Sequence, residues 1–137
     1  MRPRLLIVDD DADVREVVEL VLLDTGWEID SVGGGADAVA VCGRAVVDGV
    51  LLDLEMPGMN GRETLARLRG EPGTAGLPVV FLTATAEPGL AAELGALGAT
   101  AVFGKPFDPL RLGDRLAAAF GWLTTTDGPP QDRCVAG

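Results

Sequence analysis

The sequence predicts an α/β fold in which helices cover both faces of a five-stranded parallel sheet. Three observations support this prediction. Short apolar runs rich in β-formers alternate five times with segments of helical periodicity. The first run, 5–8, is continuously apolar, as expected for a strand that is covered on both faces. The length of 137 residues suits one domain with a single core.

The first half of the chain contains three strands and two helices. After the strand at 5–8, apolar residues recur at helical spacing, at Val14, Val17, Val18, Val21 and Leu22. Gly26 is expected to end that helix. The next elements are a strand over 28–32, a helix marked by Ala36, Val39, Ala40 and Gly43, and a strand over 49–53. Gly33 to Gly35 form the loop between strand and helix, because no Lys-Ser/Thr follows to make a phosphate loop.

The second half continues the alternation after a turn-rich loop at 55–60. The expected elements are a helix over 62–69 with Leu65 and Leu68 inward, a strand over 79–83, a helix from near Pro88 with Leu90, Leu94 and Leu97, a strand over 101–103, and a last helix with Leu112, Leu116, Ala119 and Phe120 inward. We place the domain at 1–121. Residues 122–137 are expected to form a flexible C-terminal tail, because they are rich in Thr, Gly and Pro.

Composition excludes several function classes. The formal net charge of −10 disfavours direct nucleic-acid binding, which depends on Lys and Arg. The chain has no histidine, so it lacks Ser-His-Asp hydrolase chemistry and cannot donate from a phosphohistidine. Two cysteines, Cys42 and Cys134, make neither a disulfide framework nor a zinc site. No apolar run approaches the ~18 residues of a membrane span and no signal peptide is visible, so we expect a cytoplasmic protein with no membrane contact.

Polar residues collect at the expected carboxyl ends of four strands. The first strand ends in Asp9 and Asp10, and the third ends in Asp53. The fourth ends in Thr83, and the fifth runs into Lys105. In a doubly wound, flavodoxin-like sheet of order 2-1-3-4-5, the first and third strands flank the switch point where ligands bind. The three carboxylates are therefore expected to share one crevice.

Three adjacent carboxylates repel one another unless a cation compensates them. Mg2+ fits because it accepts few protein carboxylates and leaves positions for water and a phosphate oxygen. The acidic run 9–13 has a second interpretation, which is simple capping of the first helix. A calcium loop is excluded, because its twelfth position would be Leu20 instead of Glu and its sixth position lacks glycine. Asp53 or Thr83 alone would be an ordinary turn residue, so the prediction depends on the agreement of four strand ends.

Lys105 is the only lysine beside ten arginines. A compact ammonium on a flexible stem can follow a phosphoryl oxygen where a planar guanidinium fits less well. The position of this residue next to the acidic residues therefore favours a phosphate site.

Four motifs resemble those of response-regulator receiver domains of two-component signalling, including chemotaxis regulators: Leu6–Asp10, Leu51–Gly61, Leu82–Ala84 and Lys105–Phe107. The similarity spans about residues 3–121. It implies that Asp53 accepts a phosphoryl group and that Asp10 binds Mg2+ directly. It also implies that Asp9 binds the ion mainly through water and that the backbone carbonyl of Glu55 is a further ligand.

The resemblance further implies that Thr83 is a switch hydroxyl and that Lys105 contacts a phosphoryl oxygen, with a cis Lys105-Pro106 bond. Output would pass through the face formed by the fourth helix, fifth strand and fifth helix. One position departs from the family, which usually has Tyr or Phe three residues before the lysine. That position is Val102, and Phe103 is expected to point to the other side of the strand.

The implied partners are a sensor histidine kinase or phosphotransfer protein and an unidentified downstream protein. The implied chemistry is limited to self-phosphorylation and self-dephosphorylation. Two alternatives stay open. One is a receiver fold that acts as a scaffold without phosphorylation. The other is an aspartyl-phosphate hydrolase, which normally carries its nucleophile on the first strand with a second Asp two residues later, whereas Asp53 follows the third strand.

Overall fold

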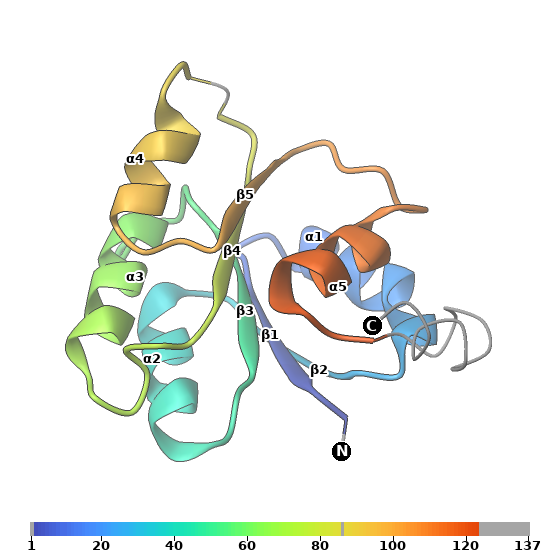
Figure 1. Cartoon of the computed structure of the whole chain (residues 1–137), viewed down its shortest axis with the longest axis horizontal. Helices are drawn as coiled ribbons and strands as arrows, with labels where there is room; N and C mark the ends of the chain where they lie inside the picture. The colour runs from blue at the N-terminus through green and yellow to red at the C-terminus, as the bar shows by residue number, and fades with distance from the viewer. Residues whose placement is uncertain (1, 86, 124–137) are drawn as a thin grey trace.

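The computed structural model describes residues 2–85 and 87–123. Its elements in chain order are β1 (Arg4–Val8), α1 (Ala12–Val21), the short 3-10 helix η1 (Leu23–Thr25), β2 (Glu28–Val32), α2 (Gly35–Arg44), β3 (Gly49–Asp53), α3 (Gly61–Gly70), β4 (Val79–Thr83), α4 (Leu90–Ala96), β5 (Ala101–Gly104) and α5 (Leu112–Phe120). The strands form one parallel sheet of order β2-β1-β3-β4-β5. The predicted doubly wound, flavodoxin-like fold is confirmed (Figure 1).

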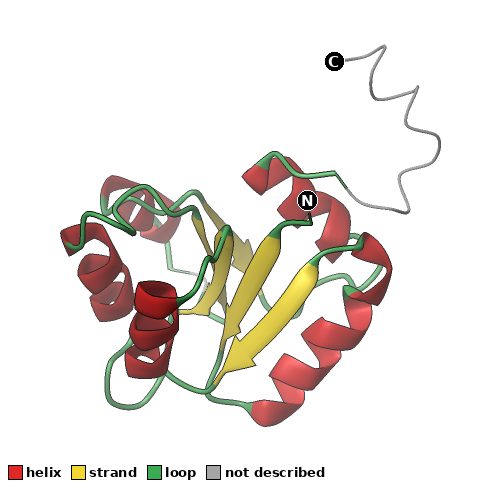
Figure 2. Ribbon diagram, turned by 90° about the horizontal axis from the view of Figure 1, so that it is seen from below, coloured by secondary structure: helices red, strands yellow, loops and turns green. Residues whose placement is uncertain are grey.

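Helices α1 and α5 cover one face of the sheet, and α2, α3 and α4 cover the other (Figure 1). Each face has its own core of buried side chains. Side chains of β3 and β4 alternate between the two cores, and every residue of these strands is buried. This double burial explains why the central strands read as continuous apolar runs instead of alternating ones. Because the strands are parallel, their carboxyl ends lie at one edge of the sheet (Figure 2).

The helices exist where predicted, but some of their inward faces differ. Val17 is 46% exposed and Leu97 is 48% exposed, although both belong to the apolar patterns that predicted α1 and α4. In α2, the buried residues are Gly35, Ala38 and Cys42, whereas Ala36 and Ala40 are exposed. Alanine is nearly neutral between core and surface, so the contact of α2 with α3 decides the inward face.

Two glycines have roles that differ in detail from the prediction. Gly26 ends η1 instead of α1, and its φ of 83° is the left-handed conformation that glycine adopts without cost. Gly89 precedes α4 as its N-cap, with φ 82°, so the helix begins at Leu90 and not at the expected start near Pro88.

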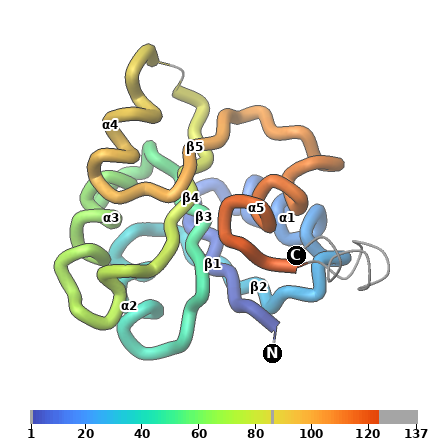
Figure 3. Tube along the Cα trace, viewed as in Figure 1, coloured from blue at the N-terminus to red at the C-terminus, as the bar shows by residue number. Residues whose placement is uncertain are grey.

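The chain after α5 returns to the start of the sheet (Figure 3). Trp122 packs edge-on against Trp27 with 5.0 Å between ring centroids, and stacks on Phe120 at 4.5 Å. The Trp27 indole N–H donates a hydrogen bond to the Leu123 carbonyl at 2.7 Å. Trp122 therefore packs on the domain and the Leu123 carbonyl is bonded to it, although the sequence places both residues in the tail segment. The remainder of that segment, with Cys134, lies outside the described residues.

Among the described residues, no helix combines the length and apolar character that a membrane crossing requires.

Candidate functional site

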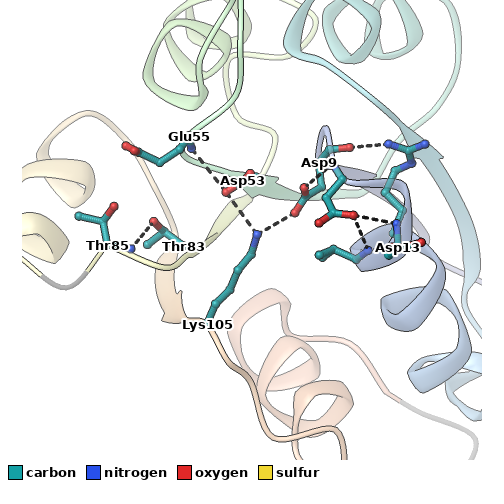
Figure 4. A network of polar contacts seen from close by, with 10 residues as sticks. Asp9, Asp13, Asp53, Glu55, Thr83, Thr85 and Lys105 are labelled. Carbon is teal, nitrogen blue, oxygen red and sulfur yellow. Dashed lines mark hydrogen bonds and ion pairs between the residues drawn. The ribbon is translucent and has the colours of Figure 1, made fainter.

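The residues predicted for the site lie at the carboxyl edge of the sheet, at the ends of four strands (Figure 4). Asp9 follows β1, and Asp53 is the last residue of β3. Thr83 is the last residue of β4, and Lys105 follows β5. The strand order makes β1 and β3 neighbours, so Asp9 and Asp53 extend from adjacent strands.

Lys105 bridges the two buried acids. Its ammonium lies 2.9 Å from Oδ2 of Asp9 and 3.5 Å from Oδ1 of Asp53. Asp9 and Asp53 are only 3% and 7% exposed, so solvent screens these charges little. One cation thus faces two carboxylates in a region of low effective dielectric constant.

A third acid completes the cluster. Asp9, Asp10 and Asp53 each offer a carboxylate oxygen, and these oxygens all lie within 4.8 Å of one another. Asp10 is exposed, so the cluster opens to solvent on its side. Three carboxylates against one ammonium leave the site about two charges negative. Oxygen ligands and excess negative charge are what a hard divalent cation requires, so the residues present fit Mg2+.

Glu55 lies next to this cluster. Its backbone N–H donates to Oδ1 of Asp53 at 3.4 Å, and its side chain points away from Asp53 (Figure 4). The role of its carbonyl as a metal ligand stays a prediction.

The electrostatic imbalance changes two pKa values. Burial raises the pKa of Asp53 above its ordinary value, and the charge of Asp9 adds to the effect. Lys105 and the Glu55 N–H oppose this without cancelling it. For Lys105, burial acts to lower the pKa, but the hydrogen bond to Asp9 and the charges of Asp53 and Asp9 outweigh it and raise the pKa. The Lys105 ammonium therefore stays charged. Ionisation of Asp53 costs more free energy in the folded protein than in the unfolded chain.

Two acids of the run after β1 have different structural roles. The Asp11 side chain caps α1 by accepting from the backbone N–H groups of Asp13 and Val14. Asp9 instead accepts from the Asp11 N–H through Oδ1 at 2.9 Å, and its own N–H donates to the Val32 carbonyl at 3.2 Å. Helix capping and an acidic cluster are both present, on different residues.

Thr83 lies at the neighbouring strand end but does not join the acidic cluster. Its hydroxyl accepts from the Thr85 N–H at 3.0 Å and points toward Thr85 (Figure 4). The Lys105 N–H donates to the Thr83 carbonyl at 2.8 Å, so the backbone connects the two residues. The Lys105-Pro106 bond is cis, as predicted.

Val102 and Phe103 point to opposite sides of β5, also as predicted. Val102 packs on the core beneath α2, α3 and α4, whereas Phe103 is buried in the core beneath α1 and α5. The Arg115 guanidinium lies over the Phe103 ring at 4.0 Å from its centroid, a cation–π contact. Phe103 is thus fixed on the side away from α4.

Two residues that shape the site were given no role in the sequence analysis. Arg15 donates to the Asp9 carbonyl at 2.6 Å. Gly61 begins α3 so close to β3 that a Cβ there would lie 2.6 Å from the Asp53 carbonyl oxygen. Gly61 could have been suspected from its place in the Asn60–Glu63 capping box, which fixes the start of α3, whereas Arg15 carries no local signal.

Comparisons with known proteins agree with this geometry. A family model described as "Response regulator receiver domain" matches residues 5–117. The chain is 39% identical over 121 residues to the DNA-binding response regulator MtrA of Mycobacterium tuberculosis, covering 86% of this chain and 50% of MtrA. It is 35% identical over 114 residues to the phosphate regulon transcriptional regulatory protein PhoB of Pseudomonas aeruginosa, covering 83% of this chain and 50% of PhoB. The chain thus spans about half the length of these curated relatives.

Among solved structures, the chain is similar to the chemotaxis response regulator CheY4 of Vibrio cholerae. The TM-score is 0.81 at 31% identity, and the match covers 87% of this chain and 99% of CheY4. The likeness therefore extends over nearly the whole of that solved chain.

Proposed function

Because this chain belongs to the response regulator receiver domain family, a signalling module, we propose that it is a phosphorylation-dependent switch with Asp53 as the phosphoacceptor. The observation that carries the proposal is the arrangement of Asp53. It is buried beside two further carboxylates and within reach of the only lysine in the sequence. The phosphodonor is a sensor histidine kinase or a phosphotransfer protein, because a chain without histidine cannot form the phosphohistidine itself.

In the proposed reaction, a carboxylate oxygen of Asp53 attacks the phosphorus of a phosphohistidine in line. The new O–P bond forms as the P–N bond breaks, and the histidine nitrogen keeps the electron pair. Lys105 lies 3.5 Å from Asp53 and can follow the phosphoryl oxygens as their charge develops. Mg2+, when bound, neutralises charge on the same oxygens. Asp10 would hold the ion directly, Asp9 mainly through water, and the Glu55 carbonyl would complete the protein ligands.

The product is an acyl phosphate, which water hydrolyses to return Asp53 and inorganic phosphate. The chain catalyses only its own phosphorylation and dephosphorylation in this proposal, and turns over no external substrate. A hydrolase of the aspartyl-phosphate class would carry its nucleophile on the first strand, whereas Asp53 ends β3.

Phosphorylation changes the site by adding about −1.5 to −2 charges and three acceptor oxygens. The Thr83 hydroxyl leaves Thr85 for the phosphoryl group, and the loop after β4 follows. The face formed by α4, β5 and α5 then presents a different shape to a downstream protein. Since β5 carries Val102 where the family usually has an aromatic residue, this motion proceeds without a rotating ring.

We place this activity in the cytoplasm, with no membrane partner. Direct nucleic-acid binding is not proposed, because the net charge of −10 repels a phosphate backbone.

The acceptor is tested by incubating the chain with a small phosphodonor and Mg2+ and measuring intact mass. Wild type is expected to gain one phosphoryl group, and Asp53→Asn is expected to gain none. Asp37→Asn, which alters an acid in the first turn of α2, is the matched control and should gain as wild type does. A phosphoryl gain that survives in the Asp53→Asn variant would reject the assignment.

Val102 also favours a second candidate, a receiver fold that works as a scaffold without phosphorylation. A pull-down with and without beryllofluoride, a mimic of the phosphoryl group, separates the two. A partner that binds equally in both conditions supports the scaffold, and one that depends on beryllofluoride supports the switch.

A further inference from the structure

Arg15 extends from the first turn of α1 back over the end of β1. Its Nη1 donates to the Asp9 carbonyl oxygen at 2.6 Å. Helical side chains lean toward the amino end of their helix, so a residue in this turn can reach the segment before the helix. Gly33 leaves room for the guanidinium, since a Cβ at that position would lie 3.3 Å from Nη1 of Arg15.

Arg15 lies in the acidic run 9–13, which attracts a cation, but at a helix end that disfavours one. The amino end of a helix carries a positive partial charge, which favours acids and disfavours arginine. The carbonyl contact, made at a part-buried position, offsets this cost. Arg15 is thus held where helix electrostatics alone would not place it.

The hydrogen bond from Arg15 adds to two others that already restrain Asp9. The Asp9 N–H is already bonded to the Val32 carbonyl, and Oδ1 of Asp9 accepts from the Asp11 N–H. With its carbonyl held by Arg15, the peptide between Asp9 and Asp10 has its plane fixed. The orientation of that plane, together with the φ of Asp10, sets the direction in which the Asp10 side chain leaves the backbone.

We propose that Arg15 is a positioning residue for the magnesium site, and that it orients the Asp9–Asp10 peptide so that both carboxylates face Asp53. This inference rests on the proposed function, which supplies the ion. Arg15 touches neither the ion nor the phosphoryl group. It acts through the peptide that carries two of the three acids.

The sign of the effect separates this proposal from simple electrostatics. A cation near a metal site repels the metal, so removing its charge should tighten Mg2+ binding. Removing a group that orients ligands should weaken binding, typically by 10- to 100-fold. The two accounts predict opposite changes for the same substitution.

The experiment measures Mg2+ affinity of the full chain by titration calorimetry at constant ionic strength. Arg15→Ala is expected to weaken binding about 10-fold or more. Arg15→Lys keeps a donor for the carbonyl and is expected to bind more tightly than Arg15→Ala. Arg44→Ala removes one exposed positive charge from the last turn of α2 and is the matched charge control, expected to stay within about twofold of wild type.

The unfolding free energy of each variant without Mg2+ provides the folding check. If Arg15 only stabilises the fold, folded Arg15→Ala protein will bind Mg2+ with wild-type affinity, and the proposal fails. Binding that is tighter than wild type also overturns it. Should Arg15→Ala not fold, Arg15→Lys against Arg15→Met makes the same comparison, because the methionine side chain has no donor for the Asp9 carbonyl, and equal affinities for these two variants reject the proposal. If wild type itself binds no Mg2+, or Asp10→Asn binds as wild type does, the failure lies with the proposed magnesium site.

Discussion

Lys105 compensates Asp9 better than Asp53. Its ammonium lies 2.9 Å from Asp9 but 3.5 Å from Asp53, and both acids are nearly inaccessible to solvent. The raised pKa of Asp53 expresses this imbalance, since burial and the neighbouring Asp9 together outweigh the lysine. The residue that we propose as phosphoacceptor is therefore a source of instability until a further cation arrives.

The first prediction concerns this instability. Asp53→Asn is expected to raise the free energy of unfolding at neutral pH without Mg2+, by on the order of 1 kcal/mol. A carboxyl whose folded pKa is raised stabilises the fold below its unfolded pKa and loses that contribution as pH rises through the folded value. The advantage of the variant should therefore vanish as pH falls below the ordinary value near 3.8.

Urea denaturation of wild type and variant across pH measures the difference. Saturating Mg2+ should reduce or reverse the difference in unfolding free energy, because only wild type retains all three carboxylates of the cluster. A variant that is less stable than wild type at neutral pH in the absence of Mg2+ would contradict the interpretation of the pKa.

Gly61 provides a second prediction at the residue scale. A Cβ there would lie 2.6 Å from the Asp53 carbonyl oxygen and 2.8 Å from the Leu54 Cα, both backbone atoms that cannot move cheaply. Gly61→Ala is therefore expected to cost about 2 kcal/mol of unfolding free energy. Gly70, at the other end of α3, has open space around it, so Gly70→Ala should be neutral or slightly stabilising. Equal stabilities of the two variants in urea would refute the close approach.

At the scale of elements, α4 is the helix with the weakest local support. It has seven residues, and its N-cap Gly89 supplies no side-chain hydrogen bond. It is tied to α3 instead. Arg62 makes a two-point contact with Glu93 at 2.8 and 3.2 Å, and Arg69 donates to the Gly98 carbonyl after α4 at 2.7 Å. The position of α4 thus depends on side chains of a neighbouring helix.

The third prediction follows from this dependence. Backbone amides of α4 are expected to exchange with solvent faster than those of α1, whose cap is formed by Asp11. Arg62→Ala should accelerate exchange in α4 by a further two- to fivefold. This range corresponds to the free energy that an exposed ion pair contributes, up to about 1 kcal/mol. Glu93→Ala should have the same effect, and the double variant should add little. Mass-spectrometric hydrogen exchange measures all three, and slow exchange in α4 of Arg62→Ala would refute the dependence.

At the scale of the whole molecule, the sheet has two differently organised edges. Its carboxyl edge gathers the acids and Lys105, whereas the chain after α5 closes over the amino edge with Trp122 and Leu123. Gly49, the first residue of β3, admits this closure, since a Cβ there would lie 2.8 Å from the Trp122 ring. The aromatic cluster thus joins α5 to the start of β3 at the end of the sheet opposite the site.

The fourth prediction tests where the folded domain ends. A chain ending at Gly121 is expected to lose about 2 kcal/mol of unfolding free energy relative to one ending at Leu123, because it lacks the Trp122 ring. The full chain serves as the common reference for the two shortened chains. Urea denaturation followed by circular dichroism measures all three. Equal stability of the two shortened chains would place the boundary at 121, as the sequence alone suggested.

The sequence by itself determined the elements and the ends at which polar residues gather. The strands at 28–32, 49–53 and 79–83 have the bounds that were predicted. Burial on both faces leaves a continuous apolar run, and the polar residue after it marks the strand end. Asp9, Asp53 and Lys105 could be placed together because the ends of parallel strands share an edge once the strand order is assumed.

Only the tertiary structure decided which neighbours each element meets. It exposed Val17, placed Arg15 on the Asp9 carbonyl, and packed Trp122 against Trp27, a residue of a distant segment. A local pattern records the periodicity of one segment, whereas these contacts join segments that approach only when the sheet assembles. The charge balance at Asp53 was also decided by the tertiary structure, because it depends on distances between the ends of three strands, β1, β3 and β5.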